Sequence, residues 1–245
     1  MISFFRKIRR FLVLENKPVR YLKYAIGEII LVVIGILIAL QINNWNEAEK
    51  ERKREKMYLE SLVIDLKESQ TELERVIEKT DQVAAASIQL LEYSIDTVPM
   101  PPPAVFDSLV LETFGYTVAM TNEGTINDIS GSGDLKVIRN DTLRRMIASW
   151  DAGFKMIRER EDLFKSAFQE NNTGLREEMD LFTGFRLEGE FLNDQTRKLL
   201  ITDLPHRNRF ISVVISARPL NELYKKKIQS IDTMIALTQR ELQEL

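Results

Sequence analysis

The chain has 245 residues, of which 44% are hydrophobic and 29% are charged, and its formal net charge is −3. This balance leaves no overall basic footprint for a nucleic acid, so we expect no nucleic-acid partner. The sequence contains no cysteine, which excludes disulfides, thiolate catalysis and zinc–thiolate sites.

The first twelve residues, MISFFRKIRRFL, have an apolar face and a basic face at helical spacing. The predicted membrane-interface residues here are Phe4, Phe5, Arg6, Lys7, Arg9 and Arg10. A short basic amphipathic helix lies in the membrane interface and is attracted to anionic lipid. The same charges also act as a topology signal. We therefore predict a cytoplasmic basic amphipathic segment over residues 1–23.

A hydrophobic run follows, with no polar side chain from Ile29 to Leu40. A bilayer core about 30 Å thick needs roughly 20 helical residues to cross it, and the stretch 24–45 supplies them. No small-residue cleavage site follows the run, which favours an uncleaved signal anchor. We predict one transmembrane helix over residues 24–45, with the lipid bilayer as a partner. Tyr21 and Tyr24 should lie at one interface and Trp45 at the other.

Basic residues beside the span predict its orientation, because cytoplasmic flanks carry more Lys and Arg. The N-terminal flank has seven, namely Arg6, Lys7, Arg9, Arg10, Lys17, Arg20 and Lys23. The C-terminal flank has five, namely Lys50, Arg52, Lys53, Arg54 and Lys56. We predict a cytoplasmic N-terminus and a periplasmic domain over residues 46–245, which places the protein in the inner membrane as a single-pass protein.

One face of the span carries Glu28, Gly35 and Ala39, spaced by seven and four residues. A small-xxx-small pair lets another helix approach closely, and an acid inside a span usually has a partner. These three residues are therefore the predicted helix–helix contact in the membrane. The alternative is that Glu28 reaches the cytoplasmic interface and pairs with Arg20 or Lys23.

The remaining chain predicts an all-α fold, with coiled-coil-like seams at alternating three- and four-residue steps. The first seam is Leu59, Leu62, Leu66, Ser69, Leu73, Val76, Thr80, Val83, Ser87 and Leu90. The second is Leu143, Ile147, Trp150, Phe154, Ile157, Glu161, Phe164 and Phe168, and the third is Tyr224, Ile228, Ile231, Ile235, Thr238, Leu242 and Leu245. We expect Leu66, Leu73, Val76, Ile147, Trp150, Ile231 and Ile235 in the core, and Glu72 on the surface.

Proline, glycine and capping residues predict the helix boundaries. The expected helices cover about 46–96, 104–116, 141–182, 205–217 and 220–245. Prolines from Pro99 to Pro103 end the first, and Asn140 or Asp141 caps the third. Gly124 and the stretch 130–134 predict a loop, and Asn171, Asn172 and Gly174 should weaken the third helix. Pro219 should kink or break the chain between the last two.

The sequence contains few residues in the patterns that catalytic or metal sites require. His206 is the only histidine, too few for a metal site of the helical-bundle type, and no HExxH or GxSxG motif occurs. We expect His206 to be exposed or to cap a helix. We predict no catalytic residue, no metal, no cofactor and no enzymatic activity, and we identify no small-molecule ligand.

The pattern FFRKIR followed by YLKYAIGEIILVVIGILIALQINNWNE resembles the opening of a family of single-span membrane proteins of unknown function from Bacteroidota. The similarity is close from Phe4 to Glu47 and continues more weakly through ISGSGDLKVIRNDTLRRMI. The resemblance implies a bacterial inner-membrane protein and implies no activity.

Two functions follow from these features. The first is a non-enzymatic scaffold, accessory subunit or self-associating module of an envelope complex, which docks through its bundle and its span. The second is a periplasmic bundle that senses a ligand and is coupled through its transmembrane helix to a membrane partner. Both predict a membrane protein partner or a homo-oligomer.

Overall fold

The structure is a computed structural model that describes residues 18–186 and 191–245. It is 84% helical, and no strand occurs within those two ranges. The predicted all-α fold class is therefore confirmed. The chain divides after Arg54 into two units, which are described separately below.

The first unit contains the N-terminal part of helix α2, whose full extent is Pro18–Glu92. Proline suits the first helical turn because its missing N–H would have no partner inside the helix there. No proline follows within the helix, and every side chain from Ile29 to Leu40 is exposed. This part of α2 therefore presents apolar surface on all sides.

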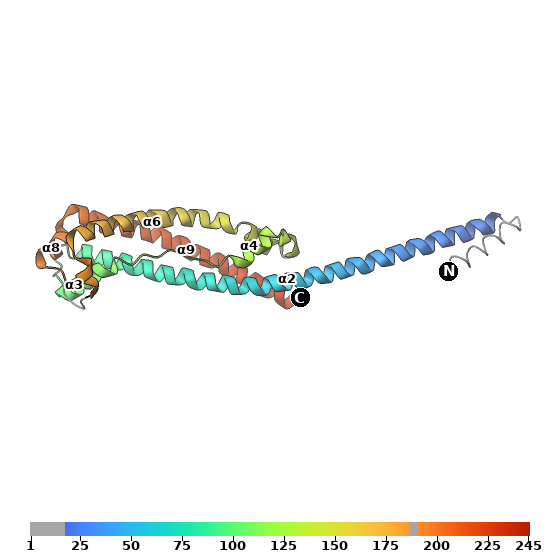
Figure 1. The fold of residues 1–245 in the computed structure, drawn as a ribbon, viewed down its shortest axis with the longest axis horizontal. Helices are drawn as coiled ribbons and strands as arrows, with labels where there is room; N and C mark the ends of the chain where they lie inside the picture. Colours follow the sequence, from blue (N-terminus) through green and yellow to red (C-terminus); the bar gives the residue numbers. More distant parts are fainter. Residues whose placement is uncertain (1–17, 187–190) are drawn as a thin grey trace. The chain divides into compact units, whose positions relative to one another are not determined.

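The second unit is built on three long helices: α2 from Glu55 onward, α6 (Trp150–Glu178) and α9 (Leu204–Glu244) (Figure 1). Cross-contacts show that α9 runs antiparallel to α2. Gln70 Nε2 lies 3.0 Å from Asp232 Oδ1, and Asn221 Nδ2 lies 2.7 Å from Asp81 Oδ1. Helices α6 and α9 are antiparallel as well, because the side chain of Lys227 lies next to Gly153 and that of Arg209 next to Gly174.

Short helices close the two ends of this bundle (Figure 1). Helices α3 (Pro103–Glu112) and α8 (Asp194–Thr202) lie at one end, with α7 (Leu181–Arg186) in the chain between α6 and α8. Helix α4 (Gly124–Gly131), the 3₁₀ helix η1 (Asp134–Val137) and α5 (Asp141–Ala148) lie at the other end. The N-caps of α5 and α8 are Asn140 and Asn193, whose side chains accept backbone N–H groups.

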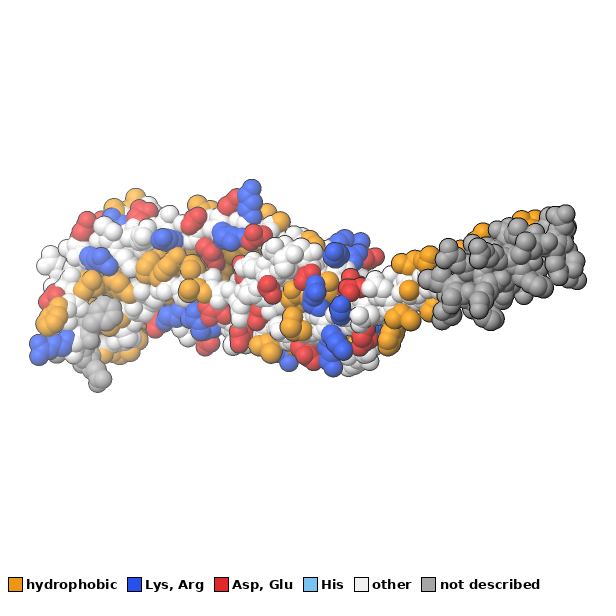
Figure 2. Space-filling view, turned by 45° about the vertical axis from the view of Figure 1, so that its right-hand side comes forward, with side chains coloured by type: hydrophobic (Ala, Val, Ile, Leu, Met, Phe, Trp, Pro, Cys, Tyr) orange, Lys and Arg blue, Asp and Glu red, His pale blue; other side chains and the backbone are white. Residues whose placement is uncertain are grey.

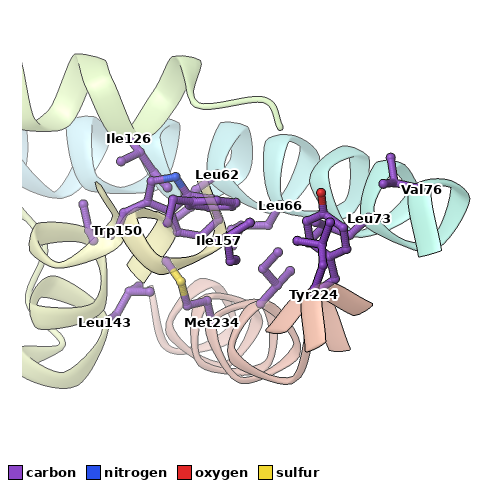
Figure 3. Close-up of a cluster of buried hydrophobic side chains, with 14 of the residues drawn as sticks. Leu62, Leu66, Leu73, Val76, Ile126, Leu143, Trp150, Ile157, Tyr224 and Met234 are labelled. Atoms are coloured by element: carbon purple, nitrogen blue, oxygen red, sulfur yellow. The ribbon is translucent and has the colours of Figure 1, made fainter. Parts of the chain in front are cut away.

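The first two predicted seams form the core (Figure 3). All ten positions of the α2 seam are buried, including the polar Ser69, Thr80 and Ser87. Seven of the eight positions of the second seam are buried, and the eighth, Glu161, accepts a 2.6 Å hydrogen bond from the Tyr224 hydroxyl. Of the seven residues expected in the core, Leu66, Leu73, Val76, Ile147, Trp150 and Ile231 are buried, whereas Ile235 is only half-buried.

The third predicted seam has the wrong register in part. Its positions Ile228, Ile235 and Leu242 are half-buried, and Leu245 is exposed. The face of α9 that enters the core is instead Leu220, Tyr224, Lys227, Ile231, Met234 and Thr238. The register was wrong because the prediction traced apolar residues only, whereas the buried face of α9 includes Lys227.

Helix α9 passes through Pro219 without a break, so the predicted division between residues 217 and 220 is wrong. Proline leaves the carbonyl of Ile215 without its helical donor, but Ile215 and Pro219 both lie on the exposed face, where water can reach. On the opposite face Ala217, Leu220 and Asn221 are buried and hold the helix against its neighbours.

The helix expected over residues 141–182 is divided at Ser149, where φ is −98° and ψ is 6°, and it ends at Glu178. The Ser149 hydroxyl donates to the Met146 carbonyl, a contact that bends helices. Asn171, Asn172 and Gly174 do not end α6, because all three are buried. A Cβ at Gly174 would lie 2.1 Å from Arg209 Nη1, so a larger residue there would displace the Arg209 side chain.

The predicted loop at Gly124 and residues 130–134 is largely helical. Helix α4 forms there because its residues Ile126 and Ile129 are buried in the core. Before α4, residues 113–123 run alongside α2 in a non-helical segment (Figure 1). Polar side chains of α2 hold it: Glu72 accepts the Met120 N–H, and Ser69 exchanges hydrogen bonds with the Asn122 backbone. Asp65 accepts the Thr125 N–H at the start of α4.

A second core cluster fills the end of the bundle formed by α3 and α8, and it surrounds one buried ion pair. Asp107 of α3 is fully buried and accepts from Arg197 Nε at 2.8 Å and Nη2 at 2.9 Å. The Asp107 carboxylate also accepts the backbone N–H groups of Phe191 and Leu192. All these bonds converge on one carboxylate, which therefore joins α3, α8 and the segment before α8.

Candidate functional site

The apolar part of α2 is the one helix, within the described residues, that is long and apolar enough to cross a membrane. Its most apolar 18-residue window has a mean hydropathy of 2.6, and none of that window is buried. Side chains from Ile29 to Leu40 are about half exposed or more, for example Leu31 at 64%. By length and composition this segment is a candidate membrane span, as predicted.

The predicted helix–helix contact residues lie on this segment. Glu28 is half-buried, and Gly35 and Ala39 are exposed. A Cβ built at Gly35 would meet no atom within 4 Å. The structure therefore leaves the small-residue face open along the helix.

The predicted interface residues are only partly within the structure. Phe4, Phe5, Arg6, Lys7, Arg9 and Arg10 lie outside the described residues. The backbone of Tyr21 and Tyr24 belongs to α2, and their side chains are not among those described. Trp45 is 70% exposed.

His206 departs from the prediction because it is buried, at 4% exposure, in the first turn of α9. Its Nε2 lies 3.6 Å from Glu178 Oε1 at the end of α6. Because His206 packs between two helices, it is neither exposed nor a cap. No group of three or more His, Asp or Glu suited to a metal ion occurs within the described ranges.

A groove between α6 and α9 is a candidate binding site among the described residues of the bundle. It encloses a volume of about 400 Å³, within the usual size range of small-molecule sites. Its apolar lining consists of Met146, Trp150, Met156, Ile157, Leu223 and Met234. Its polar lining consists of Ser149, Ser230, Lys226 and Lys227, and Ala152 and Gly153 complete it. Three of these lining residues, Trp150, Ile157 and Met234, also belong to the buried core cluster (Figure 3).

Lys227 is the unusual residue of this groove. It is 8% exposed, although lysine is almost never buried unless it is paired. Its Nζ lies 3.6 Å from the ring centroid of Trp150 and 4.2 Å from that of Phe154. Two aromatic faces thus replace part of the water that the ammonium loses on burial.

A carboxylate orients the aromatic side of this site. The Trp150 indole N–H donates to Glu123 Oε1 at 3.2 Å, and the Thr121 hydroxyl reaches the same oxygen. Burial lowers the pKa of Lys227 to about 8; Glu123 opposes this shift and Arg158 adds to it. At neutral pH the ammonium is therefore still charged, and it is poorly solvated.

Sequence reasoning missed Lys227 because the seams were traced through apolar residues. One signal was present in the sequence. Stepping back four residues from Ile231 reaches Lys227, and three residues further back lies Tyr224, so Lys227 falls on a three-four repeat with two seam residues. A lysine in a seam position is a polar residue at a core position, which local patterning treats as an error unless it serves a function.

Residues 28–97 match a family described as Family of unknown function (DUF6090). The chain is similar to that family over this range. The match covers much of the candidate span and the first bundle helix, and it supports the expectation of an uncharacterised family. No curated protein and no solved structure matches the chain.

Proposed function

We propose that this protein is a non-enzymatic subunit of a bacterial inner-membrane complex, acting as a scaffold, accessory subunit or self-associating module of the cell envelope. The observation that carries the proposal is the wholly unburied apolar segment of α2. An exposed apolar surface of this extent needs lipid or a partner to cover it. Its length suits a bilayer core of about 30 Å.

The proposed orientation follows from the basic flank before the span. Lys and Arg favour the cytoplasmic side, so the N-terminus is cytoplasmic and residues 46–245 are periplasmic. One face of this bundle carries basic and acidic side chains side by side (Figure 2). Such a mixed surface is suited to water on the far side of the membrane.

Within the membrane, Gly35 and Ala39 provide the surface on which a second helix packs. Helices in lipid associate where small residues let their backbones come close. No side chain among the described residues fills the space beside Gly35. A second copy of this helix is the simplest occupant of that face, and Glu28 lies on the same stripe.

Single-cysteine cross-linking tests this contact, because the natural chain has no cysteine. We expect Ala39→Cys in the full chain, oxidised in its membrane, to form disulfide-linked dimers. Adding Gly35→Leu should lower the dimer yield about fivefold, the effect of losing about 1 kcal/mol of association free energy.

Val33→Cys is the matched control, because residue 33 lies on the other side of the helix and is equally exposed to the membrane. It should give little cross-linked dimer. Equal yields from Ala39→Cys and Val33→Cys, both unaffected by Gly35→Leu, would show that this face is not a contact.

The groove at Lys227 favours a second function, in which the bundle binds a small ligand and passes the signal to a membrane partner. Helix α2 contains both the candidate span and a core helix of the bundle. A ligand that shifts the packing of α6 and α9 against α2 therefore acts on the same helix that enters the membrane.

A further inference from the structure

Within the described part of the chain, no carboxylate forms an ion pair with the ammonium of Lys227, although Glu123 acts on it electrostatically. Across the described residues, no hydrogen bond or ion pair to its Nζ occurs, and its close neighbours are the rings of Trp150 and Phe154. Aromatic faces compensate only part of the cost of burying a charge. The site therefore retains an unmet preference for an anion.

Gly153 opens a path from the groove to this ammonium. A Cβ at Gly153 would lie 3.3 Å from Lys227 Nζ, and apart from its chain neighbours and the backbone of its own helix, no other atom would lie within 4 Å of it. Gly153 is itself exposed and lines the groove. The absent side chain thus leaves a gap through which a ligand atom in the groove can reach the ammonium.

The rest of the groove matches a ligand with one charge and an apolar body. Met146, Met156, Leu223 and Met234 supply flexible apolar walls, and methionine adapts its shape to the group it contacts. Lys226 adds a second positive charge at the rim, and none of the described residues that line the groove is acidic.

The charges around the site favour a monoanion over a polyanion. Glu123 lies near enough to Lys227 to influence it electrostatically and is hydrogen-bonded to Trp150. This fixed negative charge would repel a second charge on the ligand. Arg158 is paired with Asp151 at 3.1 Å and Lys226 is exposed to solvent, so among the described residues Lys227 supplies the one buried positive charge that faces a ligand in the groove.

We propose that the groove between α6 and α9 binds small amphipathic monocarboxylates, with the carboxylate at Lys227 Nζ beside Gly153 and the apolar body against the methionine wall. This inference rests on the second function above and names its ligand class. Because burial lowers the pKa of Lys227 to about 8, binding should weaken as the pH rises above that value and the ammonium loses its proton.

Calorimetric titration of the full-length protein with 4-phenylbutyrate tests the site, with the uncharged 4-phenylbutyramide as the matched probe. We expect the carboxylate to bind at least about tenfold more tightly than the amide at pH 7, the effect of one charge-assisted hydrogen bond. Lys227→Met should remove this preference, whereas Lys198→Met, an exposed lysine of α8, should retain it.

Gly153→Leu provides a second variant that keeps the lysine. Leucine is a better helix former than glycine, and position 153 is exposed, so the fold should persist while the gap closes. This variant should also lose the preference for the carboxylate. Equal affinities for the two probes in the natural protein, or a preference that survives both variants, would overturn the proposal.

The site and the sensing function fail in different ways. If 4-phenylbutyrate binds with the expected preference and also changes the cross-linking yield of Ala39→Cys, both are supported. If it binds and the yield is unchanged, the site stands and coupling to the membrane helix is contradicted.

Discussion

Replacing Asp107 by alanine should lower the free energy of unfolding by about 3–5 kcal/mol, because the change removes the buried carboxylate that accepts hydrogen bonds from two nitrogens of the buried Arg197. Arg197 is 5% exposed, and two of its nitrogens bond to the Asp107 carboxylate. Burial alone would raise the pKa of Asp107, but Arg197 and the N–H groups of Leu192 and Phe191 outweigh it, so the pKa lies below its ordinary value. This contribution to stability is therefore present at neutral pH and is lost as the pH falls through the lowered pKa.

Chemical denaturation followed by circular dichroism measures this loss, and Asp194→Ala is the matched control. Asp194 bonds to the same arginine, at Nη1, but its side chain is 97% exposed. An exposed ion pair contributes at most about 1 kcal/mol. Similar losses from the two variants would mean that the buried pair does not hold this end of the bundle.

Leu73→Ala should lower the free energy of unfolding by about 2–5 kcal/mol, because it leaves a cavity where the side chain is fully buried. Leu73 occupies the middle of the α2 seam and belongs to the large core cluster. The same denaturation experiment measures the effect.

Glu74→Ala is the appropriate control, because Glu74 is the next residue of the same helix and is exposed. It should change stability by no more than about 0.5 kcal/mol. Glu72, expected from the sequence to be a plain surface residue, is unsuitable: it binds Arg75 through both oxygens and accepts the Met120 N–H. If Leu73→Ala and Glu74→Ala have the same effect, the seam does not form the core.

The α2 seam was predictable because a three-four repeat of aliphatic residues buries one helical face whatever its neighbours are. Its polar members Ser69 and Thr80 are buried as well, since the helix carries them into the core with the rest. Side-chain patterning thus gave the buried face of α2 and the candidate span, which depend on local sequence alone.

The errors arose where distant contacts override local preference. Proline disfavours a helix interior, yet Asn221, two residues after Pro219, is buried and bonded to Asp81 of α2. Gly174 disfavours a helix, yet it admits the side chain of Arg209. The segment 113–123 has no pattern of its own, because its position depends on side chains of α2.

The groove was hidden for the same reason. From the sequence alone, Lys227 is expected to be a solvent-exposed lysine. Its environment is set by Trp150 and Phe154, which lie more than seventy residues earlier in the chain. From the sequence alone, Gly153 is expected only to lower helix stability, whereas the structure places the Lys227 ammonium beside it.

Cysteine labelling in intact bacteria tests most directly that the bundle is held outside the cytoplasm by the span of α2. Met120 is 82% exposed, and Met120→Cys would be the only thiol in the chain. With a maleimide that passes outer-membrane porins but not the inner membrane, we expect labelling in intact cells as strong as that in lysed cells. Labelling only after lysis would contradict a periplasmic bundle.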